Sequence, residues 1–360
     1  MADGPPDVAT LLPTTGDDMH DDVTADGSSA DGTDSRRGSS TGGDRPRSGR
    51  TPRRSTAEGA EIRPGSLLWT TAGAPRALIP GLATGIMQLM LPGLGAGVTD
   101  YSDFFNDPFD RIDRSIPLIW GSIFAPDDDE GRERGRQIRD FHVDIKGTDG
   151  HGKRYHALDP DVYWWAHATF TWEYFRAREL FFPCPLTRRQ KDRLYAESVT
   201  WYRRYGVSDR PVPATYREFR HRFDEICRHE LELTPAVQWV LDQSTNPAAT
   251  ADPVRLPGMW SVLDGLVTNL GTETLRLLVY GPMPDVVRRR FDLPWSHSDR
   301  VAFTALCATI RAMDPAIRRG ALDAIYPEGT PHPDRRDPTR LVVAGPNRRQ
   351  RALAAARSAA

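Results

Sequence analysis

Helical periodicity dominates the middle of this 360-residue chain. From about Arg63 to Pro327 apolar residues recur every three or four positions, and no convincing alternating strand or Asn-Gly hairpin interrupts them. Asp-Pro pairs at 107–108 and 159–160 each place an N-cap before a proline that begins a helix. Further helices are predicted over 187–205, 215–231, 257–280 and 298–319. We therefore expect an all-α fold, with a single helical domain over residues 63–329.

The two ends of the chain differ in composition from this helical body. Residues 1–62 contain no Phe, Trp or Tyr, and they change from acidic (3–34) to basic (36–54). So little apolar surface cannot offset the entropy lost on ordering, so residues 1–62 are predicted to be a disordered tail. Residues 330–360 are rich in Pro and Arg and then in Ala. They are predicted to be a poorly ordered tail as well.

Composition also limits which binding partners and which cellular compartment can be expected. A formal net charge of -2 gives no support for a nucleic-acid partner. No secretory signal is visible, and the three cysteines fit reduced thiols, so a cytoplasmic protein is expected. The longest apolar stretch, 77–94, is interrupted by prolines and glycines and is too short for a spanning helix. It is interpreted as a core helix, and no transmembrane segment is expected.

Two histidines lie in apolar helical segments. Ile138, Phe141, His142 and Ile145 fall at i, i+3, i+4 and i+7, which places His142 on the buried stripe of a predicted helix. A histidine suits iron ligation or proton transfer near neutral pH, although a lone one is more often a hydrogen-bonded core residue. Arg139 lies one turn earlier, where a guanidinium could pair with a carboxylate such as a haem propionate.

The second histidine, His167, stands among Trp164, Trp165, Phe170 and Trp172. Such aromatic density suits either a large core or the walls of an apolar pocket. Three interpretations of His167 stay open: a hydrogen-bond partner of another site residue, an acid or base in a pocket, or a satisfied core histidine.

A different metal site is possible further along the chain. His221, Glu225 and His229 follow one another at i, i+4 and i+8 and line one face of a predicted helix, as the ligands of a non-haem metal would. The arginines around them favour a solvated, ion-paired helix instead. Arg111, Arg114 and Ser115 are, in isolation, an ordinary charged helix start.

Taken in order, several segments resemble the MpaB-type oxygenases, a family that includes the latex clearing proteins, or rubber oxygenases. The resemblance runs from about Ile86 to Pro327 and is carried by 88–92, Gly97-Val98-Thr99-Asp100-Tyr101-Ser102-Asp103-Phe104, Asp107-Pro108, Arg111-x-x-Arg114-Ser115, Arg139-x-x-His142, Gly147, 155–160, Trp165-Ala166-His167-Ala168, 284–288 and Leu293-Pro294-Trp295.

The resemblance implies a helical fold with a globin-like core and a b-type haem, whose iron would be held by His142 with Arg139 beside the cofactor. It places Arg111, Arg114, Ser115 and His167 as catalytic residues. Rubber oxygenases carry a lysine that can reach the iron at the position of Arg114, which stays protonated and cannot ligate it. The sixth coordination position is then expected to be open or to hold water.

Those enzymes also use an upstream glutamate as a base. No clear equivalent is present in this chain, where Asp100 and Asp103 are the nearest acids.

The resulting hypothesis is a haem-dependent oxygenase that acts with dioxygen on a small apolar metabolite, by oxygenation, oxidative cleavage or desaturation. Polyisoprene is a poor candidate substrate, because it would be met outside the cell. The alternatives are a haem-dependent dehydrogenase or oxidase, a non-catalytic haem-binding protein, and a non-haem metal enzyme that uses His221, Glu225 and His229. An electron donor is left open.

Overall fold

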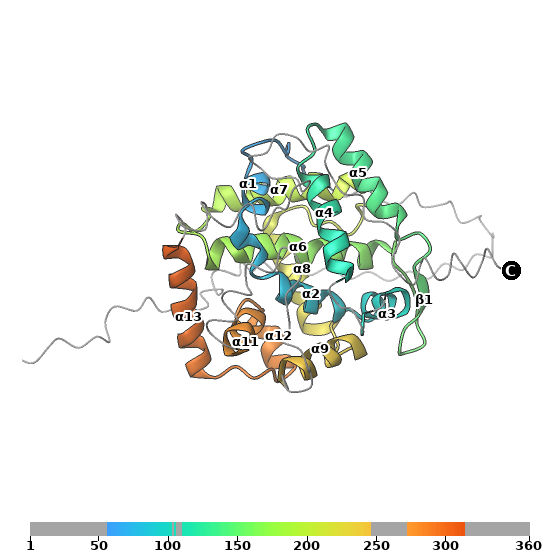
Figure 1. Cartoon of the computed structure of the whole chain (residues 1–360). Helices are drawn as coiled ribbons and strands as arrows, with labels where there is room; N and C mark the ends of the chain where they lie inside the picture. Colours follow the sequence, from blue (N-terminus) through green and yellow to red (C-terminus); the bar gives the residue numbers. More distant parts are fainter. Residues whose placement is uncertain (1–55, 103, 106–109, 246–271, 314–360) are drawn as a thin grey trace, which may run out of the picture. The chain divides into compact units, whose positions relative to one another are not determined.

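Helices build most of the described chain, and its only strands are two short ones, which confirms the all-α prediction (Figure 1). The computed structural model describes residues 56–102, 104–105, 110–245 and 272–313. Its elements are α1 (Leu67–Ala72), η2 (Pro75–Leu78), α2 (Gly81–Leu89), α3 (Pro92–Tyr101), α4 (Asp110–Ile123), α5 (Asp128–Asp140), β1 (Lys146–Thr148), β2 (Arg154–His156), α6 (Pro160–Leu180), α7 (Arg188–Arg204), α8 (Tyr216–His229), α9 (Pro235–Thr245), α11 (Thr272–Tyr280), α12 (Asp285–Arg290) and α13 (His297–Ala312). The predicted globin-like core stays a prediction.

Several helices begin and end where local chemistry predicts. The Asp159 side chain caps α6 by accepting from the Asp161 N–H at 3.0 Å, and Pro160 follows as the first helical residue. Thr187 and Gln190 form a capping box at the start of α7. The chain leaves α7 through Gly206, whose φ of 68° suits glycine. The helices predicted over 187–205 and 215–231 are thereby confirmed as α7 and α8.

Parts of other predicted segments lie outside the described residues. Within the predicted helices 257–280 and 298–319, the structure describes α11 and α13. The Asp107-Pro108 helix start, residues 1–55 and the predicted tail 330–360 are also outside the described ranges.

The prediction of no hairpin is wrong. Strands β1 and β2 pair antiparallel, with Gly147 opposite Tyr155. The turn between them depends on the carboxylate of Asp149, which accepts from the N–H groups of His151 and Lys153 at 3.0 Å, and on Gly152 with a φ of 78°. Strands of three residues are too short to show alternation, and the turn uses an Asp rather than an Asn-Gly pair.

The apolar stretch 77–94 does not form the single core helix that was expected. The chain bends through η2, begins α2 after Pro80, and begins α3 at Pro92. None of the described helices is by itself long and apolar enough to cross a membrane; only 75–89 and 92–101 taken together, bent by 97°, meet that criterion by length and composition.

Helix α6 is the central element and carries more buried aromatic residues than any other described helix. It contacts η2, α1, α2, α3 and α7, and it crosses the middle of the view in Figure 1. Trp165 is fully buried, its indole N–H donates to the Met87 carbonyl at 3.1 Å, and its ring stacks on Phe223 of α8. Burying each large side chain stabilises the fold by about 2–3 kcal/mol. Helix α6 is therefore a rigid support for the side chains it presents.

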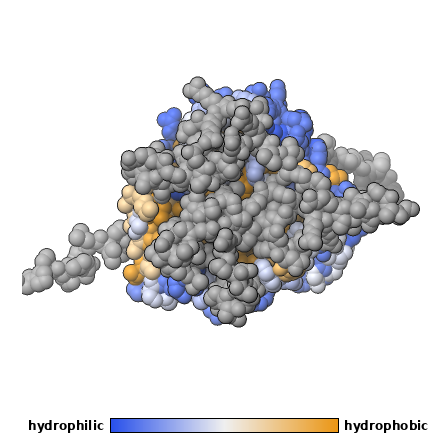
Figure 2. Space-filling view, viewed as in Figure 1, coloured by the Kyte–Doolittle hydropathy of each residue, from blue (hydrophilic) through white to orange (hydrophobic). Residues whose placement is uncertain are grey.

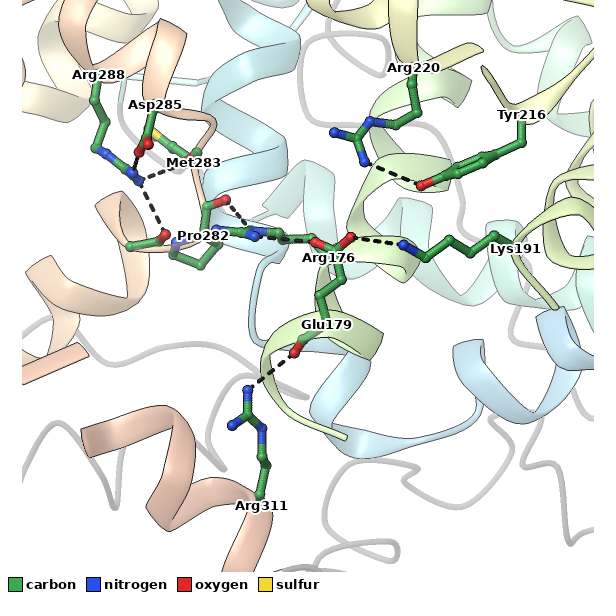
Figure 3. A network of polar contacts seen from close by, with 11 residues as sticks. Arg176, Glu179, Lys191, Tyr216, Arg220, Pro282, Met283, Asp285, Arg288 and Arg311 are labelled. Carbon is green, nitrogen blue, oxygen red and sulfur yellow. Dashed lines mark hydrogen bonds and ion pairs between the residues drawn. The ribbon is translucent and has the colours of Figure 1, made fainter. Parts of the chain in front are cut away.

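Polar contacts fix the C-terminal half of α6 to its neighbours (Figure 3). The Arg176 guanidinium donates to the Pro282 carbonyl at 2.9 Å, and Arg311 of α13 donates to the Glu179 carbonyl at 3.1 Å. The Glu179 carboxylate faces Arg176 at 3.2 Å and Lys191 of α7 at 3.9 Å. These contacts join α6 to α7, α13 and the segment before α12.

Helix α5 has one face against α7 and one that is strongly charged. Asp127 caps it by accepting from the Glu130 N–H at 2.8 Å, and acidic residues fill its first turn. Gly131 and Gly135 are buried against Arg204 of α7. Figure 2 shows a hydrophilic area at the top of the view, where α5 lies in Figure 1. Close glycine contacts on the inner face thus set the position of α5.

A short segment before α1 packs against α7. Ala57 and Ile62 are buried, the Ala60 N–H donates to the Ala196 carbonyl at 2.9 Å, and Arg203 donates to the Ala57 carbonyl at 2.7 Å. The tail predicted over 1–62 therefore includes residues that contact the helical body.

These contacts give a truncation prediction. Removing residues 1–55 is expected to leave the unfolding free energy nearly unchanged, because that segment has little apolar surface. Removing 1–62 should lower the unfolding free energy by about 2–4 kcal/mol, since the burial of Ile62 and several hydrogen bonds are lost. Urea unfolding of both truncations measures the difference; equal stability would show that 57–62 contributes nothing.

Candidate functional site

An apolar cavity of about 270 Å³ is enclosed by α2, α3, α4, α6 and the turn after α5. Most of its lining residues are aliphatic or aromatic, and the described polar exceptions are few. Cavities with apolar walls and a few placed polar groups are typical of sites for small molecules.

Glycines on the cavity-facing side of α2 leave space in the cavity, because they have no side chain. Gly81 and Gly85 both line the cavity, and a Cβ added at Gly85 would meet nothing within 4 Å. A larger side chain at Gly85 would extend into open space. The sequence of α2 thus leaves room in the cavity.

His142 lines the cavity from the turn that follows α5. The prediction that one helix continues to Ile145 with a buried stripe is wrong, because α5 ends at Asp140 and Phe141 is 42% exposed. The His142 N–H bonds to the Arg139 carbonyl at 2.9 Å in a tighter turn, and β1 follows. His142 itself is half-buried.

The tautomer of His142 follows from its hydrogen bond. Its Nδ1 lies 2.7 Å from the Ile138 carbonyl oxygen. Because a carbonyl only accepts, Nδ1 carries the proton and the lone pair lies on Nε2. Histidines that bind metals commonly donate one ring N–H to a backbone carbonyl and ligate through the other nitrogen. His142 has this arrangement at the cavity wall.

Arg139 is near His142 but is not one of the residues that line the cavity. Its guanidinium pairs with the Asp140 carboxylate at 2.7 Å, with 30% of the side chain exposed. Burial raises the pKa of Tyr163 well above its usual range, and the positive charge of Arg139 partly opposes this rise. Arg139 therefore lies near His142 in the sequence but outside the cavity lining.

His167 is buried and lines the cavity from α6. Its Nε2 lies 3.1 Å from the Ser198 carbonyl oxygen, so Nε2 carries the proton and Nδ1 has the lone pair. Nδ1 is buried and finds no hydrogen-bond partner among the described residues. Burial lowers the pKa of His167 to about 3, against a smaller opposing effect of the Ser198 carbonyl. His167 is thus a neutral acceptor at neutral pH.

The Arg111, Arg114 and Ser115 element lies in α4. Ser115 is half-buried and lines the cavity. The side chains of Arg111 and Arg114 are outside the described part of the structure. The structure thus brings Ser115, His142 and His167 to one cavity.

Sequence reasoning missed Glu173, which lines the same cavity with only 5% of its surface exposed. Helix α6 presents Tyr163, Ala166, Phe170 and Glu173 to the cavity at helical spacing. Burial raises the pKa of Glu173 to about 8, and the nearby Thr84 hydroxyl partly opposes this rise. A single carboxylate between Trp172 and Tyr174 was the signal that could have identified it.

Replacing Glu173 by glutamine should change how stability depends on pH. The folded-state pKa of about 8 lies above the unfolded value of 4.5, so the contribution of Glu173 to stability is fully present below pH 4.5 and is lost as pH rises to 8. Glutamine does not titrate. The stability of Glu173→Gln relative to wild type should therefore rise by roughly 3–5 kcal/mol across this window. Urea unfolding at several pH values measures it, with Phe170→Leu as the non-titrating control; parallel curves would contradict the assignment.

Asp100 is not among the residues that line the cavity; it accepts from the Tyr155 hydroxyl at 2.6 Å. Asp103 lies outside the described residues. Within the described ranges, no group of three or more His, Cys, Asp or Glu side chains could hold a metal ion.

The alternative metal site at His221, Glu225 and His229 is therefore wrong. His221 and Glu225 are 3.9 Å apart and largely exposed on α8, and His229 is exposed as well. Their helix face is solvated and ion-paired, as in the contact of Arg228 with Asp224 at 2.5 Å.

Comparison with protein families gives one match over most of the helical body. Residues 69–312 match the family described as "ER-bound oxygenase mpaB/B'/Rubber oxygenase, catalytic domain". No curated protein and no solved structure matches the chain. The matched range contains every element that lines the cavity.

Proposed function

The chain belongs to the family of the ER-bound oxygenases and rubber oxygenases, and we propose that it is a haem-dependent oxygenase that acts with dioxygen on a small apolar molecule. The observation that carries this proposal is the tautomer of His142. Its Nδ1–H donates to Ile138, which directs the ligating lone pair to Nε2 in a residue that lines an apolar cavity.

The residues present fit a b-type haem. His142 would hold the iron, and the apolar walls from α2, α4 and α6 would cover the macrocycle. Arg139, which pairs with Asp140 in this structure, would turn to a propionate. Haem, when bound, would supply the activation of dioxygen.

The protein's own residues would orient the substrate and exclude water. Leu118, Ile119 and Phe170 give the cavity walls that bind an apolar molecule through burial. His167 Nδ1 carries the lone pair and can accept a hydrogen bond from a ligand, and the imidazole stays neutral through the physiological range. Glu173 is a second group that can hold or release a proton, at its carboxyl oxygens.

Three residues of α4, Arg111, Arg114 and Ser115, also belong to the proposed site. Ser115 faces the cavity, and Arg111 and Arg114 lie within four residues before it on the same helix. We place these arginines on the distal or propionate side by resemblance. Because Arg114 stays protonated, it would supply positive charge and hydrogen bonds rather than a bond to iron.

An absorption spectrum of the purified full-length protein tests the proposal, recorded first oxidised and then reduced. A Soret band that shifts on reduction is expected. Incorporation of isotopically labelled dioxygen into an alkene or an aromatic hydrocarbon then separates an oxygenase from a haem-dependent dehydrogenase or oxidase, which would turn over substrate without incorporating oxygen. Haem without any turnover would favour a non-catalytic haem protein. A protein that takes up no haem would refute the proposal.

A further inference from the structure

Four buried polar groups in the cavity are not accounted for by the fold. The Tyr163 hydroxyl and His167 Nδ1 find no hydrogen-bond partner among the described residues. The Glu173 carboxyl, at 5% exposure, has no ion-pair partner within the described chain, and the nearby Thr84 hydroxyl, which also lines the cavity, has no hydrogen-bond partner there. An unsatisfied buried polar group typically costs about 1–3 kcal/mol. Such groups on the wall of a cavity therefore indicate a polar ligand atom.

Three of these groups are spread along α6. Tyr163 lies beside His142, with ring centres 5.8 Å apart. Glu173 follows ten residues later, or about 15 Å along the helix axis. The cavity thus has a His142 end and, at its far side, an end formed by Glu173 of α6 and Thr84 of α2.

The surroundings of Glu173 restrict the charge of that ligand. None of the cavity-lining residues with described side chains is a lysine or an arginine. A carboxylate or phosphate would enter without a counter-charge, next to an acidic group. Gln88 donates its amide N–H groups to Ala166 and Thr169 at 3.2 and 2.9 Å, so its donors are already used. The remaining donors suit a neutral oxygen atom that accepts a hydrogen bond.

We propose that the Glu173–Thr84 end of the cavity binds a neutral oxygen-bearing group, a hydroxyl or a carbonyl, at one end of the otherwise apolar substrate. This inference rests on the proposed function, in that it names the substrate class of the same cavity. The carboxylic acid O–H of Glu173 donates to the ligand oxygen, and the unpartnered Thr84 hydroxyl at the same end is a second polar group for it. An unsubstituted hydrocarbon would leave the Glu173 carboxyl without a partner, and it would bind less tightly.

The test uses 2-naphthol and 2-methylnaphthalene, which have nearly the same shape and differ by a hydroxyl in place of a methyl group. Calorimetric titration of the full-length protein, with whatever haem it carries, gives both dissociation constants. Wild type should bind 2-naphthol about tenfold more tightly, as one hydrogen bond predicts. Glu173→Leu should abolish this preference, and Glu173→Gln, which keeps an N–H donor, should retain part of it. Phe170→Leu, the matched control, should weaken both ligands equally.

Two results would overturn the inference. Equal affinities of wild type for the two ligands would mean that the Glu173 carboxyl makes no hydrogen bond to the ligand. An unchanged preference in Glu173→Leu would mean that another residue makes the polar contact. If Glu173→Leu does not fold by circular dichroism, Thr84→Val gives the same comparison. The Soret band, recorded on each sample, reports separately on the proposed function. A haem-free protein that still shows a Glu173-dependent preference would refute the haem-dependent function but not the polar subsite.

Discussion

His142→Ala is expected to abolish the Soret band of the purified protein while leaving its helical circular dichroism largely unchanged. His142 follows α5 in an exposed turn and is only half-buried, so its loss should cost the fold little. Its imidazole is nevertheless the proposed iron ligand. Changes in the outer shell of a metal site alone cost 10–100-fold in affinity, so loss of the ligand should weaken haem binding by more than about 100-fold.

Another histidine of the same chain provides a matched control. His221→Ala removes an exposed histidine of α8 and should leave haem content unchanged. Titration of the apoprotein with haem, followed at the Soret maximum, compares the two variants with wild type. A His142→Ala protein that keeps a full complement of haem would show that another residue holds the iron.

The sequence predicted those parts of the fold that depend on local chemistry. The start of α6 follows from Asp159 and Pro160, and the limits of α7 from Thr187 and Gly206; all are visible in a few neighbouring residues. The end of α5 could not be predicted in this way. Ile138, Phe141 and Ile145 continue the helical spacing, but the chain turns after Asp140 toward the hairpin, and Phe141 is left 42% exposed. Tertiary context decided this against periodicity.

The candidate site was only partly predictable for a similar reason. Ser115, His142 and His167 were identified from their motifs, and all three line the cavity. Glu173 was missed because its importance comes from burial and from its neighbour Thr84, which lies 89 positions earlier in the chain. A carboxylate in an aromatic helix becomes informative only when the packing around it is known.

The position of His142 depends on how closely α5 approaches α7. Gly135→Ala should disturb both the contact between these helices and the position of His142. A Cβ at Gly135 would lie within 3 Å of three backbone atoms of Arg204 and Tyr205. Backbone atoms cannot move aside as a side chain can, so α5 must shift or bend. Overpacking of this kind costs about 3 kcal/mol or more, or roughly 10 °C in Tm for a domain of this size. Because His142 follows α5 by two residues, haem retention should fall with stability.

Two other glycines in helices make this prediction specific. At Gly131 the added Cβ would meet the guanidinium of Arg204, a side chain that can adjust in part, so Gly131→Ala should cost less than Gly135→Ala. At Gly85 the Cβ meets nothing within 4 Å, and Gly85→Ala should stabilise the fold by up to about 1 kcal/mol through helix propensity. Thermal unfolding of the three variants should therefore rank them Gly85, Gly131, Gly135 in order of falling Tm. If Gly135→Ala unfolds at the wild-type temperature, α5 is not held against α7 by this close contact, and the location of His142 at the cavity wall needs another cause.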